Sequence, residues 1–174
     1  MAKVLVAAFV GAMLPDLSLY LLAGASLFVL GIPPQHVFDV LYFSDLWQTI
    51  FAIDNSFFVW GALFGIAVWR RVPWAIALTG AALLHLALDM PLHHDDGRPH
   101  FWPLSRWVFE SPVSYWDVNH GAVWVAPFEA VLALGAAIVL WRRRVPVWAA
   151  LFCLPLVAAE IWIVRQWLFF FVDA

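Results

Sequence analysis

The sequence predicts an all-α protein, a polytopic bundle of transmembrane helices. Of its 174 residues, 65% are hydrophobic and only 12% are charged. A soluble domain is about 45–50% apolar and about 25% charged, so this composition indicates an integral membrane protein. Apolar segments long enough to cross a bilayer recur along the chain, and its length suits one compact domain. We therefore predict a single integral-membrane domain covering residues 1–174.

Five spans are expected. The four clearest apolar segments are 56–70, 73–91, 121–141 and 146–171. A further apolar region, 3–31, is interrupted by Pro15-Asp16. Proline removes a backbone donor, so this region is either one kinked span or two half-helices broken at a cavity. We count it as one span, retained rather than removed as a signal peptide.

The basic residues predict the orientation. They lie before the first span and in the two short connections, at Lys3, Arg70-Arg71 and Arg142-Arg143-Arg144. Cytoplasmic connections carry an excess of Lys and Arg, so five spans place the N-terminus inside and the C-terminus outside. The longer loops, 32–52 and 92–120, then face outward. We expect a multi-pass protein of a bacterial inner membrane, with these loops in the periplasm. Only nine scattered basic residues are present, so nucleic acid is not an expected partner.

Titratable side chains cluster around the end of the third span. Five of the six histidines and four aspartates fall in one window, at His85, Asp89, His93, His94, Asp95, Asp96, His100, Asp117 and His120. His85 and Asp89 are four residues apart, so on a helix they share one face. Imidazole with carboxylate suits zinc, and manganese or iron are alternatives. A divalent metal, zinc above all, is the expected cofactor, with His93 or His94 completing its ligand shell.

Other interpretations stay open for these residues. A buried His–Asp pair is often only a hydrogen bond, and His93-His94-Asp95-Asp96 alone is typical of a solvated loop. Asp16 favours a functional site, because ionisable residues inside a span are costly and usually mark function. Asp54 and Asn55 precede the second span, where the simplest interpretation is that they cap a helix.

Several motifs resemble a known family. They are "LPD" at 14–16, "DNS" at 54–56, "HLALD" at 85–89, "HHDDGRPHFWPLS" at 93–105 and "SPVSYWD" at 111–117. Together they resemble the YdjM-like membrane-bound metal-dependent hydrolases, a family similar to zinc-dependent phospholipase C and single-strand nucleases. The resemblance implies Asp16, His85 and Asp89 as metal ligands. This chain has Asn55 where many members carry a histidine.

The leading functional hypothesis is a metal-dependent hydrolase at the outer membrane–water interface. A metal ion lowers the pKa of its bound water, and a spare carboxylate can act as general base. The candidate bases are Asp95, Asp96 and Asp54. The candidate substrate-binding residues are Arg98, Arg106, His100 and His120. A membrane lipid or lipid-linked phosphoester is the expected substrate.

The alternative is a non-enzymatic subunit of a larger membrane complex. Twelve tryptophans suit packing against another membrane protein, a second copy of the chain or a pigment. In that case His85 or His120 would ligate a porphyrin, or the cluster would hold a structural metal ion.

Overall fold

The computed structural model is helical over about 75% of the chain. It describes residues 2–115 and 117–169, but not the side chains of 168 and 169. Within these ranges it contains no strand, and five helical segments are long and apolar enough to cross a membrane. The predicted all-α class and the five candidate spans are therefore confirmed. Trp116, within the 111–117 motif, lies outside the described residues, as do residues 1 and 170–174 of the predicted domain.

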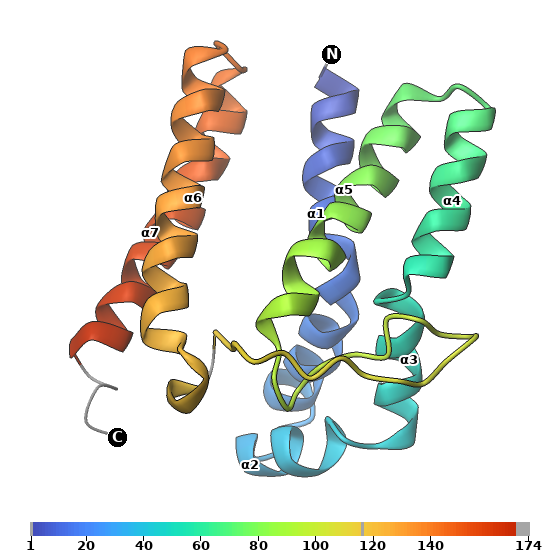
Figure 1. The fold of residues 1–174 in the computed structure, drawn as a ribbon, viewed down its shortest axis with the longest axis vertical. Helices are drawn as coiled ribbons and strands as arrows, with labels where there is room; N and C mark the ends of the chain where they lie inside the picture. Colours follow the sequence, from blue (N-terminus) through green and yellow to red (C-terminus); the bar gives the residue numbers. More distant parts are fainter. Residues whose placement is uncertain (1, 116, 170–174) are drawn as a thin grey trace. The chain divides into compact units, whose positions relative to one another are not determined.

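Seven α-helices and four shorter π- or 3₁₀-helices follow one another along the described chain (Figure 1). In order they are α1 (Ala2–Gly24), η1 (Ala25–Val29), α2 (Pro34–His36), η2 (Val37–Leu41), α3 (Asp45–Asp54), α4 (Phe57–Trp69), α5 (Pro73–Asp89), η3 (Met90–Leu92), η4 (Val118–His120), α6 (Ala122–Arg142) and α7 (Val147–Phe169).

Two expectations about the spans need attention. Helix α1 continues through Pro15, so the alternative of two broken half-helices is wrong and the single span is confirmed. The predicted outer loop 32–52 is too long, because α2, η2 and most of α3 lie within it. The second candidate span accordingly runs from Asp45 to Trp69. Polar residues in α3 had hidden its helical character from a search for apolar segments.

The contacts divide the chain into two compact units, which are described separately. Unit 1 comprises Met1–Met90 and Asp96–Phe109, and unit 2 comprises Pro91–Asp95 and Glu110–Ala174. The expectation of a single domain stays a prediction.

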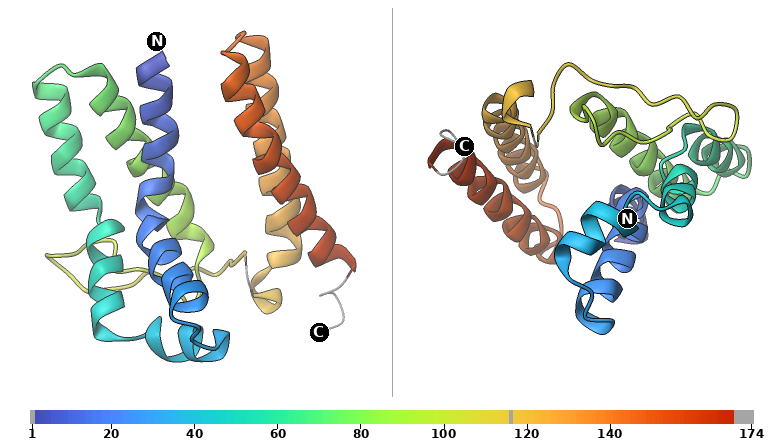
Figure 2. Two further views of the ribbon diagram at one scale, coloured as in Figure 1. Left: turned by 180° about the vertical axis from the view of Figure 1, so that it is seen from behind. Right: turned by 90° about the horizontal axis from the view of Figure 1, so that it is seen from below.

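In unit 1, α1 and α5 run parallel and side by side, with α4 antiparallel to them (Figures 1 and 2). The close approach depends on Gly11, because a Cβ atom there would lie 2.0 Å from the carbonyl oxygen of Leu78. Lys3 and Arg70-Arg71 fall at one end of this unit, where α1 begins and α4 turns into α5. Helix α3 and the segment 96–109 lie at the other end.

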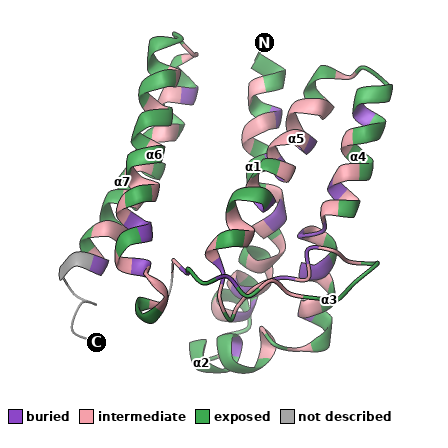
Figure 3. Cartoon of the chain, in the orientation of Figure 1, coloured by how far each residue is buried: buried purple, intermediate pink, exposed green. Residues whose placement is uncertain are grey.

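In unit 2, α6 and α7 form an antiparallel helical hairpin (Figure 1). Ala122, Ala126 and Trp167 form its small buried core, and most other side chains on both helices are exposed or half-buried (Figure 3). Gly121 allows the sharp entry into α6, because its φ of +84° is unfavourable for residues with a side chain. Arg142, Arg143 and Arg144 lie at the connection between the two helices.

Candidate functional site

Unit 1 brings Asp16 of α1 and His85 of α5 together. The Oδ2 atom of Asp16 lies 3.5 Å from the Nε2 atom of His85, and the two side chains are 32% and 19% exposed. The Nε2 atom itself is buried and makes no hydrogen bond. A buried nitrogen without a hydrogen bond is uncommon and calls for an explanation. The pair therefore combines proximity with an unused coordination position on the imidazole.

Asp89 and Tyr20 extend this polar pair by about one helical turn on each helix. Asp89 is four residues beyond His85 and ends α5, and Tyr20 is four residues beyond Asp16. Because α1 and α5 lie side by side and residues four apart share one face of a helix, Tyr20 and Asp89 continue the Asp16–His85 pair in the same direction along the two helices.

Asn55 connects the junction between α3 and α4 to α1. Its side chain is buried, and its Nδ2 donates hydrogen bonds to the carbonyl oxygens of Pro15 at 3.2 Å and Phe51 at 3.1 Å. The chain has an amide here because an amide can donate to two backbone carbonyls at once. Asn55 thus fixes the helix position immediately before Asp16.

The interpretation of Asp54 and Asn55 as N-cap residues of the helix that follows them is wrong. The N-cap of α4 is Ser56, whose hydroxyl oxygen accepts hydrogen bonds from the backbone of Phe58 and Val59. Asp54 ends α3 and Asn55 follows as its C-cap, so α4 begins one residue later than the capping interpretation requires. The Ser56 hydroxyl also donates to the carbonyl oxygen of Trp102.

Asp54, a predicted general base, lies in unit 1 beside α1. Its carboxyl group is close to the Ser18 side chain, two residues after Asp16. Its backbone carbonyl accepts a hydrogen bond of 2.6 Å from the indole nitrogen of Trp60. Asp54 therefore lies where α3 ends, beside α1, and the hydrogen bond from Trp60 of α4 holds its backbone there.

Arg98 is buried against aromatic rings. Its guanidinium carbon lies 4.8 Å from the ring centre of Tyr42 and 4.5 Å from that of Phe51. Burial raises the pKa of the Tyr42 phenol, Arg98 opposes this rise, and the carboxylate of Asp96 adds to it. Arg98 is only 6% exposed. The geometry thus gives Arg98 a packing role, and its predicted role in substrate binding stays a prediction.

His100 holds the segment after Arg98 against α4. Its Nδ1 donates to the carbonyl oxygen of Arg98 at 2.7 Å, and its own carbonyl accepts from the backbone of Phe57 at 2.9 Å. The ring is buried beside that of Phe57. These contacts explain the position of His100 without a substrate.

Arg106 lines a cavity of about 460 Å³ between α3 and the segment 99–108. The other polar residues of its lining are Asp45, Gln48 and Thr49, and Trp102 adds an aromatic wall. Arg106 was predicted from the sequence, whereas Asp45, Gln48 and Thr49 were not, because the helix that aligns them, α3, was expected to be a loop.

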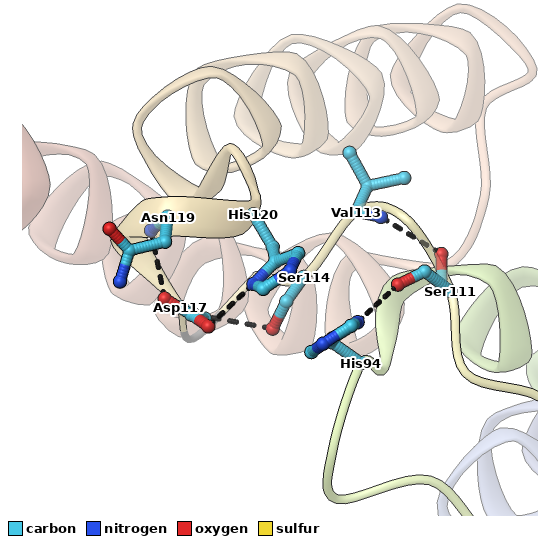
Figure 4. A network of polar contacts seen from close by, with 7 residues as sticks. All are labelled: His94, Ser111, Val113, Ser114, Asp117, Asn119 and His120. Atoms are coloured by element: carbon cyan, nitrogen blue, oxygen red, sulfur yellow. Dashed lines mark hydrogen bonds and ion pairs between the residues drawn. The ribbon is translucent and has the colours of Figure 1, made fainter.

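The other histidines predicted for the site, His93, His94 and His120, belong to unit 2, and Figure 4 shows the polar contacts around His94 and His120. The Nδ1 of His94 donates to the carbonyl oxygen of Ser111 at 2.7 Å, and the Nδ1 of His120 lies 2.6 Å from Asp117 Oδ2. The two imidazole rings stack with their centres 3.5 Å apart. His93 is buried, and its Nε2 is joined to the hydroxyl of Tyr115 at 3.2 Å.

Hydrogen bonds of the backbone and of Ser111 also order this part of unit 2. The Ser111 backbone donates to the His93 carbonyl, and its hydroxyl donates to the Pro91 carbonyl at 2.5 Å. The hydrogen bond from His120 holds the pKa of the Asp117 carboxyl below its ordinary value, and the Asn119 backbone contributes. Together these contacts join the beginning of the outer loop to its end.

The predicted ligands and bases are thus divided between the two units. Asp16, Asp54, His85, Asp89 and Asp96 belong to unit 1, whereas His93, His94 and the exposed Asp95 belong to unit 2. Among the residues that the structure describes, no three His, Cys, Asp or Glu side chains are grouped as a metal site. Within the predicted ligand set, Asp16 and His85 lie within 4 Å of each other.

Sequence reasoning missed Tyr20, Ser18 and Gly11. Tyr20 follows Asp16 by one turn of α1, so its spacing was a usable signal. The importance of Gly11 emerges only from the position of Leu78 on another helix.

Comparison with family models, with curated proteins and with solved structures found no match. The resemblance to the YdjM-like hydrolases therefore stays a prediction carried by the quoted motifs.

Proposed function

We propose that this protein is a membrane-embedded, metal-dependent hydrolase with its centre at Asp16 and His85. The observation that carries the proposal is the buried Nε2 of His85, which makes no hydrogen bond although Asp16 Oδ2 lies 3.5 Å away. That separation exceeds the usual length of an N–H···O hydrogen bond. Ionisable side chains inside a membrane span cost free energy, and they usually mark a functional site.

The same separation suits two ligands of one metal ion. Zinc binds imidazole nitrogen and carboxylate oxygen at about 2.0–2.2 Å, so a tetrahedral angle places the two atoms about 3.4 Å apart. Catalytic zinc sites use three protein ligands. Asp89 is the proposed third because it lies four residues after His85 on α5, and its side chain would have to turn toward the ion, since no three such side chains are grouped among the described residues. Manganese and iron would accept the same ligands.

Each nearby residue has a proposed part in the chemistry. Bound here, a divalent ion would lower the pKa of a water molecule and polarise a phosphoryl oxygen. Asp54, beside Ser18 at the same end of the unit, would accept the proton of the attacking water. Asn55 would keep α1 in register through Pro15. Asp95 and Asp96 remain alternative bases in the outer loop.

The proposed substrate is a lipid or a lipid-linked phosphoester at the outer face of a bacterial inner membrane. In unit 1, Lys3 and Arg70-Arg71 lie at one end and the α3 helix at the other. With the basic end in the cytoplasm, Asp16 and His85 would be approached from the periplasmic side, and the N-terminus would be inside.

Elemental analysis of the purified chain tests the proposal. We expect a stoichiometric divalent metal ion that is lost in His85→Ala and Asp16→Asn. The control His36→Ala, which removes an exposed histidine of α2, should keep the metal ion. Hydrolysis of a lipid phosphoester should be lost with the metal. Metal-free wild-type protein, or variants that keep the full metal content, would contradict the proposed centre.

A second candidate function is that of an accessory subunit in a membrane complex. It is favoured by the large aromatic side chains that unit 2 leaves exposed, including Trp124, Trp141 and Trp162. Such faces suit lipid, another membrane protein or a second copy of this chain. Copurification of a stable partner with an inactive, metal-free chain would support this function instead.

A further inference from the structure

The cavity lined by Arg106 has features of a binding site that is distinct from the Asp16–His85 pair. It lies in unit 1, between one face of α3 and the segment 99–108, and its volume is about 460 Å³. Its lining includes Ala52, which is only 4% exposed, and the exposed residues Asp45, Thr49 and Arg106. A volume of this size is typical of small-molecule sites.

The two charges of the lining do not neutralise each other. In the part of the chain that the structure describes, no ion pair within 4 Å joins Asp45 and Arg106. Arg106 would attract a simple anion, but Asp45 would repel it. Asp45 would attract a simple cation, but Arg106 would repel it. A ligand carrying both a positive and a negative group satisfies both side chains.

The hydrogen-bonding groups of the lining indicate which chemical groups would carry the two charges of the ligand. Gln48 donates its amide hydrogen to the Tyr42 carbonyl at 2.7 Å, so its Oε1 atom is still an acceptor. That oxygen, the Thr49 hydroxyl and the Asp45 carboxylate offer three acceptors, which matches the three N–H donors of a primary ammonium group. The planar guanidinium of Arg106 suits a phosphate through paired hydrogen bonds. Trp102 offers an aromatic face for the intervening carbon atoms or for the cation.

The position of the cavity favours a lipid. Asp45 is the first residue of the candidate span Asp45–Trp69, so the cavity lies where the apolar part of the chain ends. We propose that this cavity binds a phosphate–ammonium zwitterion, the headgroup of a phosphatidylethanolamine. The proposal does not rest on hydrolysis, because it concerns binding by residues outside the proposed metal centre.

Native mass spectrometry of the full-length chain in detergent tests the chemistry with three lipids of identical acyl chains. Phosphatidylethanolamine carries both charges, phosphatidylglycerol lacks the amine, and phosphatidylcholine lacks the N–H donors. We expect phosphatidylethanolamine to bind about tenfold more tightly than either, since a hydrogen bond to a charged group is typically worth that factor or more. Equal binding of all three lipids would overturn the proposal.

Two variants separate the two charges. Asp45→Asn should remove the preference for phosphatidylethanolamine over phosphatidylglycerol, and Arg106→Gln should weaken both lipids about tenfold. Asp39→Asn and Arg143→Gln are matched controls, because both residues are exposed and outside the cavity lining. Circular dichroism and thermal unfolding check that each variant is folded. A folded Asp45→Asn protein with the wild-type preference would overturn the role of the ammonium group.

Competition with soluble compounds distinguishes a lipid from a free metabolite. Phosphoethanolamine should displace the lipid, whereas inorganic phosphate or ethanolamine alone should do so at least tenfold more weakly. Tighter binding of the lipid than of phosphoethanolamine supports the membrane source, and equal affinities would overturn it. Metal content should stay that of wild type in Asp45→Asn, so failure here is distinguishable from failure of the hydrolase proposal.

Discussion

The two histidine-containing regions of this protein differ in how their imidazoles are satisfied. In unit 1, His85 lies within a candidate span, and its Nε2 is buried beside Asp16 without a hydrogen bond. In unit 2, His94 and His120 lie outside the candidate spans, and each uses its Nδ1 for a short hydrogen bond. The same residue types therefore leave an imidazole nitrogen buried without a hydrogen bond in one region and form a hydrogen-bonded network in the other.

Adjacent histidines in the sequence therefore need not include a histidine whose ring nitrogen is buried without a hydrogen bond. The conspicuous His93-His94 pair has protein partners in Tyr115 and Ser111, which anchor the outer loop. His85, which its spacing to Asp89 already distinguishes in the sequence, has a buried Nε2 atom 3.5 Å from Asp16 Oδ2 that makes no hydrogen bond. Buried polar atoms are normally hydrogen-bonded, so an exception such as His85 Nε2 calls for an explanation.

The largest loss of stability is expected from separating α1 and α5, the helices that carry Asp16 and His85. Gly11→Ala places a Cβ atom against the Leu78 backbone, which must move because no side-chain rotation relieves the contact. We expect a loss of about 1–3 kcal/mol in unfolding free energy, with weaker metal binding. Gly65→Ala is the control, since a Cβ there meets nothing within 4 Å. Denaturant unfolding in the same detergent gives the midpoint of each variant. Equal midpoints for Gly11→Ala and Gly65→Ala would contradict this packing.

The second prediction compares the two regions directly. His85→Ala should lower metal affinity by at least about tenfold, because it removes a proposed ligand. His94→Ala should leave metal affinity unchanged and instead loosen the loop that it joins to Ser111. Zinc titration with a chromophoric competitor measures the first effect, and limited proteolysis between 95 and 115 measures the second. Reversed results would place the metal in the outer loop.

A smaller effect is expected at the junction that positions Asp16. Asn55→Ala removes the buried amide that donates to Pro15 and Phe51, which should cost about 1–2 kcal/mol of stability. Asn119→Ala, at an exposed asparagine of unit 2, should be close to neutral. Thermal unfolding of the pair of variants provides the measurement. An unchanged Asn55→Ala protein would show that this connection is dispensable.

The smallest effect concerns the pH response of unit 2. The pKa of Asp117 is lowered in the folded state by the His120 hydrogen bond. The stabilisation is therefore complete above the unfolded-state pKa of about 3.9 and is lost as pH falls through the lower folded-state value. The ¹³C chemical shift of the Asp117 carboxyl should titrate below about pH 3.9 in wild type. In His120→Ala the midpoint of this titration should move to higher pH. An unchanged midpoint would show that His120 does not lower the pKa of Asp117.

The fold was more predictable than the site. Apolar segments of span length are enough to predict helices, since a backbone in lipid must satisfy its own hydrogen bonds. The polar residues of α3 broke that pattern and produced an overlong predicted loop. For the site, the i,i+4 pair of His85 and Asp89 was visible in the sequence, but the approach of Asp16 depends on Gly11, Leu78 and Asn55.

Composition and local spacing are enough to predict a helical chain with several candidate spans and with His and Asp side chains near the end of one of them. The burial of His85 Nε2 beside Asp16 and the common cavity of Asp45 and Arg106 could not be predicted in this way. The reason is physical: both features arise from contacts between residues distant in the sequence, and the close packing that allows them is set by whole helices rather than by their local patterns.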